Sequence, residues 1–343
     1  MSAIGVGFVG GGPVTQAIHL PALATLGDQF RTLRIMDVNA QVADEVAARY
    51  GAVGSTDADP IYADPEVEVV AICSPNAFHA EQVIAACRAG KKAVLCEKPL
   101  AVSIEEAHAI RTAALASGTA IFVGTMHAYD PAYLAAREAW KASGDVALQV
   151  RNAIFLPSND VFTNQATELV PVPPAKWPGG EPDRAMIKTM MRGAMLGLAI
   201  HDIPLVRDFH PEVGQVQFAE FLPPFGYALV STAHGSTAEL TAMMPGQWPP
   251  KWTFEVIGRT HRLRAEMPPS YVMAGSACVE VSGPQGMQVF QSGTNGYQAL
   301  WQAIAATVRD RVPPPITLDT AIADLAFALD LAANIDLCLD SAA

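Results

Sequence analysis

The sequence predicts a two-domain protein, in which a doubly wound, parallel α/β domain is followed by an α+β domain with a mostly antiparallel sheet. Three observations predict this class. Residues 1–125 alternate strand-like and helix-like segments, later residues form short apolar runs between Gly, Pro and Ser, and 343 residues exceed the usual size of one hydrophobic core. We therefore expect one domain over residues 1–125 and a second over residues 126–343.

Strand-like and helix-like segments follow one another in strict order through residues 1–125. Glycines close the helical patterns at Gly51, Gly90 and Gly118, and Ser103 with Glu106 forms a capping box at the start of the last helix. Because a helix follows each strand, the strands are expected to run parallel. The expected strands cover residues 4–9, 30–36, 67–73, 93–96 and 120–123, and the expected helices cover residues 15–26, 40–50, 77–89 and 103–118.

Residues 126–343 show a different pattern. Short apolar runs predict a mostly antiparallel sheet, and the expected strands cover residues 147–156, 226–234, 237–243, 252–258, 277–281 and 287–291. Residues 158–183 are rich in Pro, Asn, Asp and Gly and are expected to form a long loop. Helical patterns cover residues 296–311 and 317–340.

Charge and composition limit the possible partners. The chain has 22 Lys and Arg against 34 Asp and Glu, a net charge of −12, and no basic block, which argues against binding nucleic acid or an anionic membrane. No apolar stretch approaches membrane-spanning length and the first residues lack the pattern of a secretory leader, so we expect a cytoplasmic protein. The five cysteines lack the spacing of a zinc site, which predicts reduced thiols and no metal.

A glycine-rich turn, Gly10-Gly11-Gly12-Pro13-Val14-Thr15, follows the first strand. Glycines let the backbone approach a pyrophosphate closely, and the first N–H groups of the following helix can bind it. Thr15 stands where the third glycine of such a turn packs the helix on the strand, so the match is partial. We expect Gly10, Gly12, Pro13 and Val14 to bind a dinucleotide cofactor.

Asp37 ends the second strand, where a carboxylate can accept hydrogen bonds from the adenosine ribose hydroxyls. A carboxylate there would repel the additional phosphate of NADP, so NAD is expected in preference to NADP. The alternative is that Asp37 is an ordinary turn residue before the helix of residues 40–50.

Lys98 closely follows the apolar run of residues 93–96, in the order Cys96-Glu97-Lys98-Pro99. Polar groups at the carboxyl ends of parallel strands are where open α/β sheets bind their ligands, so Lys98 is a candidate for chemistry. The alternative is a solvated lysine at a strand end.

Two further segments carry a family resemblance: Ser74-Pro75-Asn76-Ala77-Phe78-His79, and residues 89–100 with their Glu97-Lys98-Pro99. Together with the glycine turn and Asp37, they resemble the glucose-fructose oxidoreductase / inositol dehydrogenase / rhizopine catabolism (Gfo/Idh/MocA) oxidoreductase family. The resemblance implies a Rossmann domain that binds NAD(P), with Lys98 contacting cofactor and substrate and a cis Lys98–Pro99 bond. It also implies cofactor contacts from Ser74, Pro75, Asn76, His79 and Glu97.

For the second domain the resemblance implies an open, mostly antiparallel sheet that binds substrate, and a last helix, residues 317–340, that packs back on the Rossmann domain. An exposed face of such a sheet would be an apolar patch too large for a monomer. A homodimer or homotetramer is therefore expected.

The family commonly carries an aspartate, three residues and then a histidine in the second domain, both directed at the substrate. His201 matches the histidine, whereas Gly197 stands in place of the aspartate. A neutral imidazole can accept a hydroxyl proton near neutral pH. Asp202 would point away from His201 on a helix, and its expected role is structural.

A second departure from the family follows residue 125. Met126, His127 and Ala128 stand where an Asn or Gln and one or two Arg are common. His127 or Tyr129 could still reach a substrate hydroxyl, or Tyr129 could pack against the domain hinge. The loss of arginine argues against a phosphorylated or carboxylated substrate.

These residues predict an NAD-dependent oxidoreductase that transfers a hydride between nicotinamide and a secondary alcohol or ketone of a sugar, inositol or related polyol. His201 would act as the general base and Lys98 would hydrogen-bond the reacting oxygen. Gly197 leaves two alternatives open: an NAD-binding sensor without catalysis, or an enzyme that recycles a tightly bound NAD during elimination, epimerisation or deglycosylation.

Overall fold

The protein is described from a computed structural model, which describes residues 2–166, 168–171, 182–246 and 248–341. Its contacts divide the chain into two compact units. The first comprises Met1–Gly124, Thr163–Trp177 and Tyr297–Leu325, and the second comprises Thr125–Phe162, Pro178–Gly296 and Ala326–Ala343. Two segments beyond residue 125 thus belong to the first unit. The division into domains of residues 1–125 and 126–343 stays a prediction.

The first unit contains a six-stranded parallel sheet in the order β3-β2-β1-β4-β5-β6. Its strands are β1 (Ile4–Val9), β2 (Phe30–Met36), β3 (Val53–Ser55), β4 (Val69–Ile72), β5 (Ala93–Cys96) and β6 (Ala120–Val123). Strands β1, β4 and β5 are buried throughout, as expected of central parallel strands covered on both faces. This strand order is that of the Rossmann fold, so the predicted fold class of this unit is confirmed.

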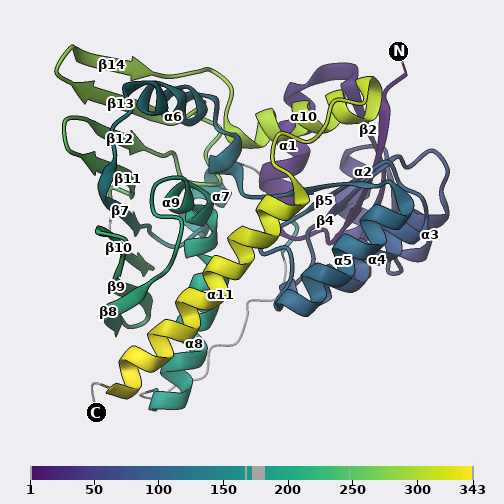
Figure 1. The fold of residues 1–343 in the computed structure, drawn as a ribbon. Helices are drawn as coiled ribbons and strands as arrows, with labels where there is room; N and C mark the ends of the chain where they lie inside the picture. Colours follow the sequence, from purple (N-terminus) through teal and green to yellow (C-terminus); the bar gives the residue numbers. More distant parts are fainter. Residues whose placement is uncertain (1, 167, 172–181, 247, 342–343) are drawn as a thin grey trace. The chain divides into compact units, whose positions relative to one another are not determined.

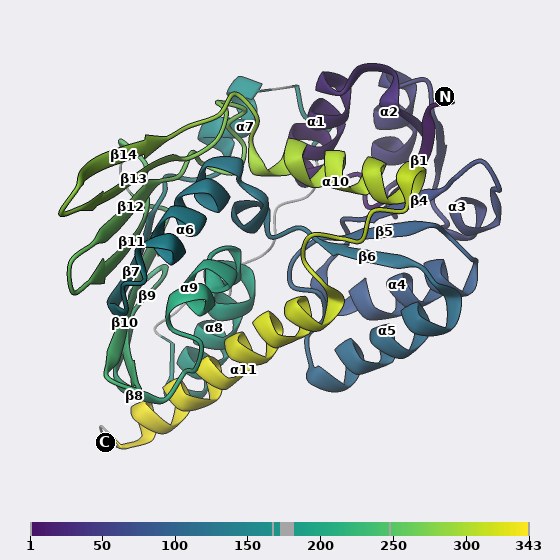
Figure 2. The same cartoon turned by 45° about the horizontal axis from the view of Figure 1, so that its top comes forward.

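Helices cover both faces of this sheet: α1, α2 and α10 lie on one side and α4 and α5 on the other (Figure 2). Local signals in the sequence set their ends. Asn39 caps α2 by accepting a hydrogen bond from the N–H of Gln41, and Gly118 ends α5 with a φ of 74°. The helices of this unit are α1 (Leu20–Thr25), α2 (Ala40–Arg49), α3 (Asp59–Ala63), α4 (His79–Arg88), α5 (Ile104–Ser117) and most of α10 (Gly296–Asp310).

The strand register brings five chain segments to one edge of the first sheet. Val9 lies opposite Met36 and Ile72, and Cys96 lies opposite Ile72 and Val123. The strands therefore end level with one another. The residues that follow them are Gly10, Asp37, Cys73, Glu97 and Gly124, and this edge is where doubly wound sheets bind their ligands.

The second unit contains an eight-stranded sheet in the order β14-β13-β12-β11-β7-β10-β9-β8. All neighbours are antiparallel except β7 and β10, which confirms a mostly antiparallel sheet. The strands are β7 (Ala147–Phe155), β8 (Gln215–Phe221), β9 (Phe225–Ala233), β10 (Ser236–Met244), β11 (Lys251–Gly258), β12 (Arg262–Glu266), β13 (Cys278–Gly283) and β14 (Gly286–Phe290).

Helices α6 (Pro131–Ser143), α8 (Arg184–Gly197) and α9 (Ile203–Phe209) cover one face of this sheet (Figure 1). Helix α7 (Asp160–Ala166) lies within the segment that was predicted to be a loop, so that prediction is wrong for these residues. The loop was predicted from composition, and an Asn-Asp pair can begin a helix as well as a turn. The predicted loop residues 172–181 lie outside the described residues.

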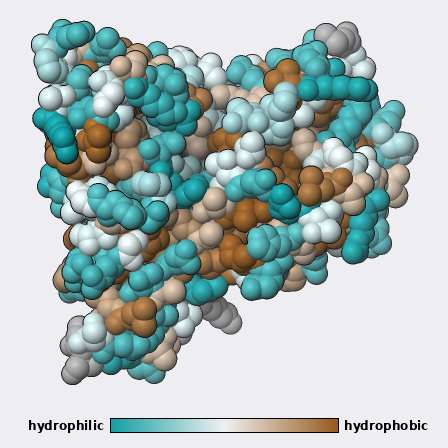
Figure 3. Space-filling view, in the orientation of Figure 1, coloured by the Kyte–Doolittle hydropathy of each residue, from teal (hydrophilic) through white to brown (hydrophobic). Residues whose placement is uncertain are grey.

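The other face of the second sheet carries a row of alternating charges. Glu239, Arg151, Glu255, Arg264 and Glu280 lie opposite one another on five adjacent strands. Arg151 Nε lies 3.0 Å from Glu239, and its Nη1 lies 3.8 Å from Glu255. The expectation that this face is a continuous apolar patch is therefore wrong. Figure 3, in the orientation of Figure 1, shows a different side of the molecule, where polar and apolar residues lie next to one another.

The last helix, α11 (Leu318–Ser341), contributes to both units. Its residues up to Leu325 belong to the first unit, where Asp319 accepts a 2.6 Å hydrogen bond from Arg111 of α5. Its later residues belong to the second unit, where Asp340 pairs with Lys188 of α8 at 2.7 Å. Among the helices that the structure describes, none is long and apolar enough to cross a membrane.

Candidate functional site

The glycine turn opens the ligand-binding edge of the first unit. Gly10 has a φ of +103°, and a Cβ on it would lie 2.6 Å from the carbonyl oxygen of Cys73, so only glycine fits here. A Cβ on Gly12 would meet nothing within 4 Å, which leaves the outer side of the turn open. Pro13 and Val14 are helical, and the N–H of Gln16 donates to Gly12 O at 3.0 Å. Pro13 therefore sits at a first helical position, where its missing N–H costs nothing.

The helix after this turn begins in an unusual conformation. Thr15, Gln16 and His19 lie in a π-helical turn, η1 (Thr15–His19), which leads into α1. The buried Thr15 hydroxyl donates to Gly10 O at 2.5 Å, and Gln16 Nε2 donates to Gly11 O at 2.8 Å. The wider turn and these bonds accommodate Thr15 where a third glycine was expected. They also hold the carbonyls of the glycine turn.

Asp37 lies against the glycine turn. Its Oδ2 accepts a hydrogen bond from the N–H of Gly11 at 2.9 Å, and its Oδ1 accepts one from Asn39 at 2.9 Å. Each carboxylate oxygen has two lone pairs, so both keep capacity for a hydroxyl donor. A close glycine turn, an open side at Gly12 and a carboxylate at the end of β2 fit the pyrophosphate and adenosine ribose of a dinucleotide.

The Ser74–His79 segment follows β4 and is tied to the loop after β5. His79 is buried, and its two ring nitrogens lie 2.7 Å from Pro99 O and 2.9 Å from Ser74 O. Both nitrogens are thus engaged by backbone carbonyls, and the ring joins the two loops. Ser74 donates to Gln82 at 2.6 Å, whereas Pro75 and Asn76 are exposed.

Glu97 is buried and paired with a histidine that lies 78 positions earlier in the chain. His19 Nε2 lies 2.8 Å from Glu97 Oε1, and the indole N–H of Trp301 points at His19 Nδ1 across 3.2 Å. The His19 ring also packs edge-on against Tyr297 and Trp301. Gly124 faces the same carboxylate, since a Cβ on it would lie 2.6 Å from Glu97 Oε1.

The electrostatics of this pair favour a charged carboxylate. Burial raises the pKa of Glu97, but the hydrogen bond and charge of His19, with Lys98, lower it below its ordinary value. Burial lowers the pKa of His19, and Cys73 and Glu97 outweigh it and raise that pKa to about 10. The N–H of Trp301 instead favours a neutral ring, because an indole can only donate. In either state the proton on Nε2 is donated to Glu97.

Lys98 follows Glu97 and is partly exposed. Burial of the ammonium lowers the pKa of Lys98, and the neighbouring Glu97 opposes this shift. The N–H of Lys98 donates to Glu97 Oε2 at 3.2 Å, so the carboxylate binds both His19 and the backbone of Lys98. The Lys98–Pro99 peptide bond is cis, as the resemblance implied.

His201 belongs to the second unit, so it is described with that unit. It lies in a short 3₁₀ turn, η5 (Ala199–His201), after α8 ends at Gly197, so Gly197 and His201 do not share one α-helix. The buried ring packs edge-on against Trp252, and its Nδ1 lies 3.2 Å from Met126 Sδ. A thioether is a weak acceptor, so this contact favours a proton on Nδ1.

Asp202, next in sequence, is fully buried and is surrounded by hydrogen-bond donors. His127 Nδ1 lies 2.5 Å from Oδ1, whereas Asn152 Nδ2 and Trp252 Nε1 each donate to Oδ2 at 2.6 Å. His127 packs edge-on against Trp252 with ring centroids 4.7 Å apart. The second unit thus gathers His127 and His201 around one indole, and Tyr129 is buried in the same 3₁₀ turn as His127.

Sequence reasoning missed His19, Asn152, Trp252 and Trp301, and it gave Asp202 only a structural role. The partners of these residues are 50 to 282 positions away in sequence, so no local pattern could reveal the pairs. The argument about Asp202 assumed one continuous helix, whereas Asp202 stands between the 3₁₀ turn and α9.

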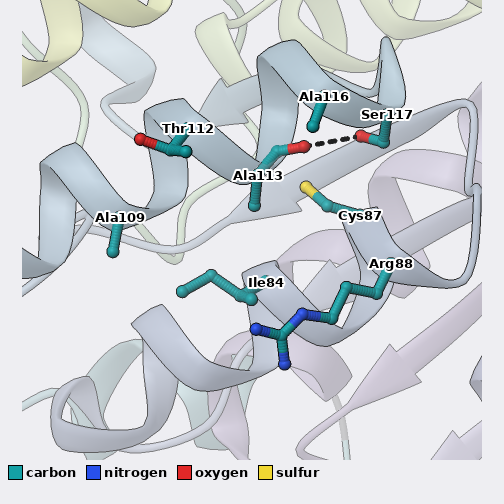
Figure 4. Close-up of a pocket in the computed structure, with 8 residues that line it drawn as sticks. All are labelled: Ile84, Cys87, Arg88, Ala109, Thr112, Ala113, Ala116 and Ser117. Atoms are coloured by element: carbon teal, nitrogen blue, oxygen red, sulfur yellow. Dashed lines mark hydrogen bonds between the residues drawn. The ribbon is translucent and has the colours of Figure 1, made fainter.

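A surface groove of the first unit lies apart from this edge. It runs between α4 and α5 and is lined by Ile84, Cys87, Arg88 and small residues of α5, with Ser117 bonded to the Ala113 carbonyl at its rim (Figure 4). The groove lies along the helices and not at the strand ends, so we assign no chemistry to it. Within the described residues, no group of three or more His, Cys, Asp or Glu side chains could hold a metal ion.

Comparison with known proteins identifies the first unit. Residues 4–125 match the oxidoreductase family with an NAD-binding Rossmann fold (GFO_IDH_MocA). The inositol 2-dehydrogenase of Rubrobacter xylanophilus is 32% identical over 214 residues, which are 60% of this chain and 60% of that protein. The levoglucosan dehydrogenase of Pseudarthrobacter phenanthrenivorans is 40% identical over 118 residues, 32% of this chain and 30% of the relative.

The chain spans about 40% to 60% of the length of the inositol 2-dehydrogenases it matches. Solved structures resemble it over more of its length. The 3-ketoreductase KijD10 of Actinomadura kijaniata, in complex with NADP, has a TM-score of 0.74, covers 97% of this chain and 98% of its own, and is 17% identical. The UDP-N-acetylglucosamine 3-dehydrogenase of Acidithiobacillus ferrooxidans has a TM-score of 0.73 over 99% and 100%, also at 17% identity. At these identities the likeness shows the fold.

Proposed function

Since the chain belongs to the Gfo/Idh/MocA family of oxidoreductases, we propose that it oxidises a secondary alcohol of a sugar, inositol or related polyol, or reduces the matching ketone, with a nicotinamide cofactor. The single observation that carries the proposal is the register of the first sheet. It brings the glycine turn, Asp37 and the Glu97–Lys98 pair to one edge. When bound, the nicotinamide supplies the hydride acceptor or donor.

The glycine turn and Asp37 would hold the adenosine half of the cofactor. Gly12 and Val14 would present backbone N–H groups to the pyrophosphate, and Gly12 leaves the turn uncrowded there. Gly10 and Pro13 would shape the turn, because Gly10 allows its positive φ and Pro13 begins the helix without needing an N–H partner. Asp37 would bind the ribose hydroxyls and repel a 2′-phosphate, so we propose NAD over NADP. The exposed Pro75 and Asn76 would contact the cofactor, whereas Ser74 and His79 would hold their loop in position.

Lys98 would act on the reacting oxygen. Its ammonium can donate hydrogen bonds to a hydroxyl that is losing its proton and stabilise the developing negative charge. Glu97 would orient Lys98, because its carboxylate is fixed by His19 and also accepts the N–H of Lys98. His201 would accept the hydroxyl proton in the oxidation direction.

The substrate class rests on relatives and on residue types. The names of the relatives refer to inositol and levoglucosan, both polyhydroxylated rings. Met126, His127 and Ala128 supply no guanidinium for bidentate binding of a phosphate or carboxylate. A neutral polyol therefore fits these residues better than a sugar phosphate or sugar acid.

A homodimer or homotetramer remains part of this proposal. Its support is the family and no longer an apolar face, because the uncovered sheet face carries the charged row of Glu239, Arg151, Glu255, Arg264 and Glu280. Alternating charges allow a shifted copy of the same face to pair with opposite signs. Sedimentation at low and high salt would test this association.

A panel of neutral polyols and sugars, with NAD and NADP, tests the proposed function. We expect NADH formation with at least one neutral polyol such as myo-inositol, and stabilisation of the protein by NAD in a thermal-shift assay. Stabilisation by NAD without NADH formation would favour a sensor. Nicotinamide cofactor released only on denaturing the purified protein would favour a recycled, tightly bound NAD.

A further inference from the structure

The contacts of Asp202 set its carboxylate apart from an ordinary helix cap. Asp202 occupies the N-cap position of α9, yet its side chain makes no cap hydrogen bond. Asp at an N-cap usually stabilises its helix by about 1 kcal/mol through such a bond. Here the carboxylate instead binds His127, Asn152 and Trp252.

The neighbours of Asp202 give up further hydrogen bonds. Asn152 turns its Nδ2 toward Asp202, and this leaves its enclosed Oδ1 without a partner among the described residues. The reverse orientation would direct the amide oxygen at a carboxylate, which cannot donate to it, so Nδ2 is the atom that faces Asp202. The hydroxyl of Tyr227, buried in the same sheet, also lacks a partner there. An unsatisfied buried group costs about 1–3 kcal/mol.

Stability alone does not account for an arrangement with these costs. Missing cap bonds and unsatisfied buried groups are expected mainly at functional sites, where a side chain is held for chemistry. The side chain that Asp202, Asn152 and Trp252 hold in place is the ring of His127. Oδ1 of Asp202 lies 2.5 Å from Nδ1 of His127, and the rings of His127 and Trp252 meet edge-on at an interplanar angle of 83°. The ring of His127 therefore has a set orientation.

The donors around Asp202 favour one tautomer of His127. Both contacts of Oδ2 are N–H donors, as an ionised carboxylate requires, and an ionised Asp202 accepts at Oδ1 a proton that Nδ1 of His127 carries. The neutral ring then keeps its lone pair on Nε2. Within the described residues Nε2 has no hydrogen-bond partner, and it is not among the fully enclosed polar atoms that lack one.

We propose that His127 is a proton-transfer residue of the second unit, and that Asp202 is the positioning residue that keeps the proton on Nδ1 and leaves Nε2 to take a proton from a substrate hydroxyl. This inference rests on the proposed function. His127 and Asp202 together supply a base that is held by a carboxylate. Gly197, which stands where the family has an aspartate, has no carboxylate.

The step balances with the proposed oxidation. The hydroxyl O–H bond breaks and an Nε2–H bond forms, and the charge of the imidazolium is balanced by Asp202. As the carbonyl forms, the C–H hydrogen leaves with its electron pair to the nicotinamide cofactor. In this step His127 takes the place that the proposed function gives to His201, whose ring packs against the same indole of Trp252.

Nitrogen NMR of the full chain, labelled with ¹⁵N-histidine, tests the tautomer directly. Among the signals of the eight histidines, we expect one from a neutral ring protonated on Nδ1 that disappears in His127→Gln. In Asp202→Asn the amide NH₂ would face Nδ1, so the proton should move to Nε2. A His127 that carries its proton on Nε2 in the unsubstituted protein overturns the proposal, even if Asp202→Asn does not fold.

Kinetics with myo-inositol and NAD test the role in turnover. We expect His127→Gln and Asp202→Asn to lower kcat by about 10²–10⁴-fold, with KM within about threefold. Trp252→Phe is the matched control for Asp202, because it removes one donor to Oδ2 and keeps an aromatic ring beside both histidines, so the proton should stay on Nδ1. His210→Gln is the control for losing a buried histidine of this unit that bonds only serine hydroxyls.

Gly197 offers a gain-of-function arm. A Cβ at Gly197 meets nothing within 4 Å, so Gly197→Asp adds a carboxylate at the position of the family aspartate with no clash at its Cβ. If His127 and Asp202 already serve as the base, Gly197→Asp changes kcat by less than about threefold in the otherwise unsubstituted protein. Added to His127→Gln, the same substitution raises kcat by more than about tenfold. Unchanged kcat in His127→Gln contradicts the proposal. If the unsubstituted protein turns over no polyol, the proposed function fails, and the spectrum still decides the tautomer.

Discussion

Nε2 of His19 lies 2.8 Å from Oε1 of Glu97, and this buried pair links the helix after the glycine turn to the residue that precedes Lys98. A second histidine–glutamate pair, His234 with Glu212, has nearly the same length, 2.7 Å, but both of its side chains are exposed. Because both pairs join a histidine and a glutamate, comparing them measures how burial changes the contribution of such a pair to stability.

Glu97→Gln should destabilise the first unit by about 3–5 kcal/mol, because the buried His19 then lacks the carboxylate charge that it is paired with. Glu212→Gln should change stability by less than about 1 kcal/mol. Because the folded pKa of Glu97 is lowered, its contribution is present above about pH 4.3 and is lost as the pH falls through the lowered value. Thermal unfolding at pH 7 and pH 4 measures both effects. Equal losses in the two variants would contradict the account.

Gly124→Ala tests the close approach of the backbone to Glu97. The added Cβ would lie 2.6 Å from Oε1, so the carboxylate must move away from His19 or Lys98. We expect a loss of about 1–3 kcal/mol and a turnover at least tenfold lower. Gly193→Ala is the control, since nothing lies within 4 Å of its Cβ in α8, and it should stabilise the protein by about 0.5–1 kcal/mol. A Gly124→Ala enzyme with full turnover would show that the position of Glu97 does not matter.

The pH dependence of turnover should report Lys98. Burial lowers the pKa of its ammonium, so activity that needs the charged form should fall on the alkaline side at a pH below 10.5. In Lys98→Arg the guanidinium stays charged, and this alkaline fall should disappear while kcat drops for geometric reasons. The check is kcat against pH for both proteins. The same alkaline fall in the arginine variant would assign it to another group.

Cofactor choice should depend on the charge of Asp37. We expect NAD to have a lower KM than NADP, and Asp37→Ser to reduce that preference by about 10- to 100-fold. Asp37→Asn is the control, because its amide oxygen can still accept from Gly11 while the charge is gone. If repulsion decides the choice, both variants lose the preference. Retention of it in Asp37→Asn would assign the choice to the shape of the turn.

The first unit was predictable from sequence because its signals are local. Strands β1, β2, β5 and β6 have the predicted bounds. β1, β5 and β6 are short apolar runs, β2 mixes apolar and polar residues, and each is followed directly by a glycine or an acidic residue. The strand β3 and the helix α3 were missed, because segments of three and five residues carry no periodicity.

The second unit was less predictable because its order depends on distant pairings. The strands β8 and β12 were missed, and nothing local indicates that β7 pairs in parallel with β10. In the site, Gly10, Asp37 and Lys98 could be found because each lies within two residues of the end of a strand. His19, Asn152 and Trp252 could not, because their partners are brought to them only by the finished fold.

The central claim is that hydrogen passes from a polyol carbon to a nicotinamide cofactor at the Lys98 edge of the first unit. Its most direct test is a turnover with NAD and myo-inositol deuterated at every carbon, followed by mass spectrometry of the reduced cofactor. We predict one deuterium in each reduced cofactor and at least a 100-fold lower yield with Lys98→Ala. Reduced cofactor without deuterium, or an undiminished yield from Lys98→Ala, would contradict the claim.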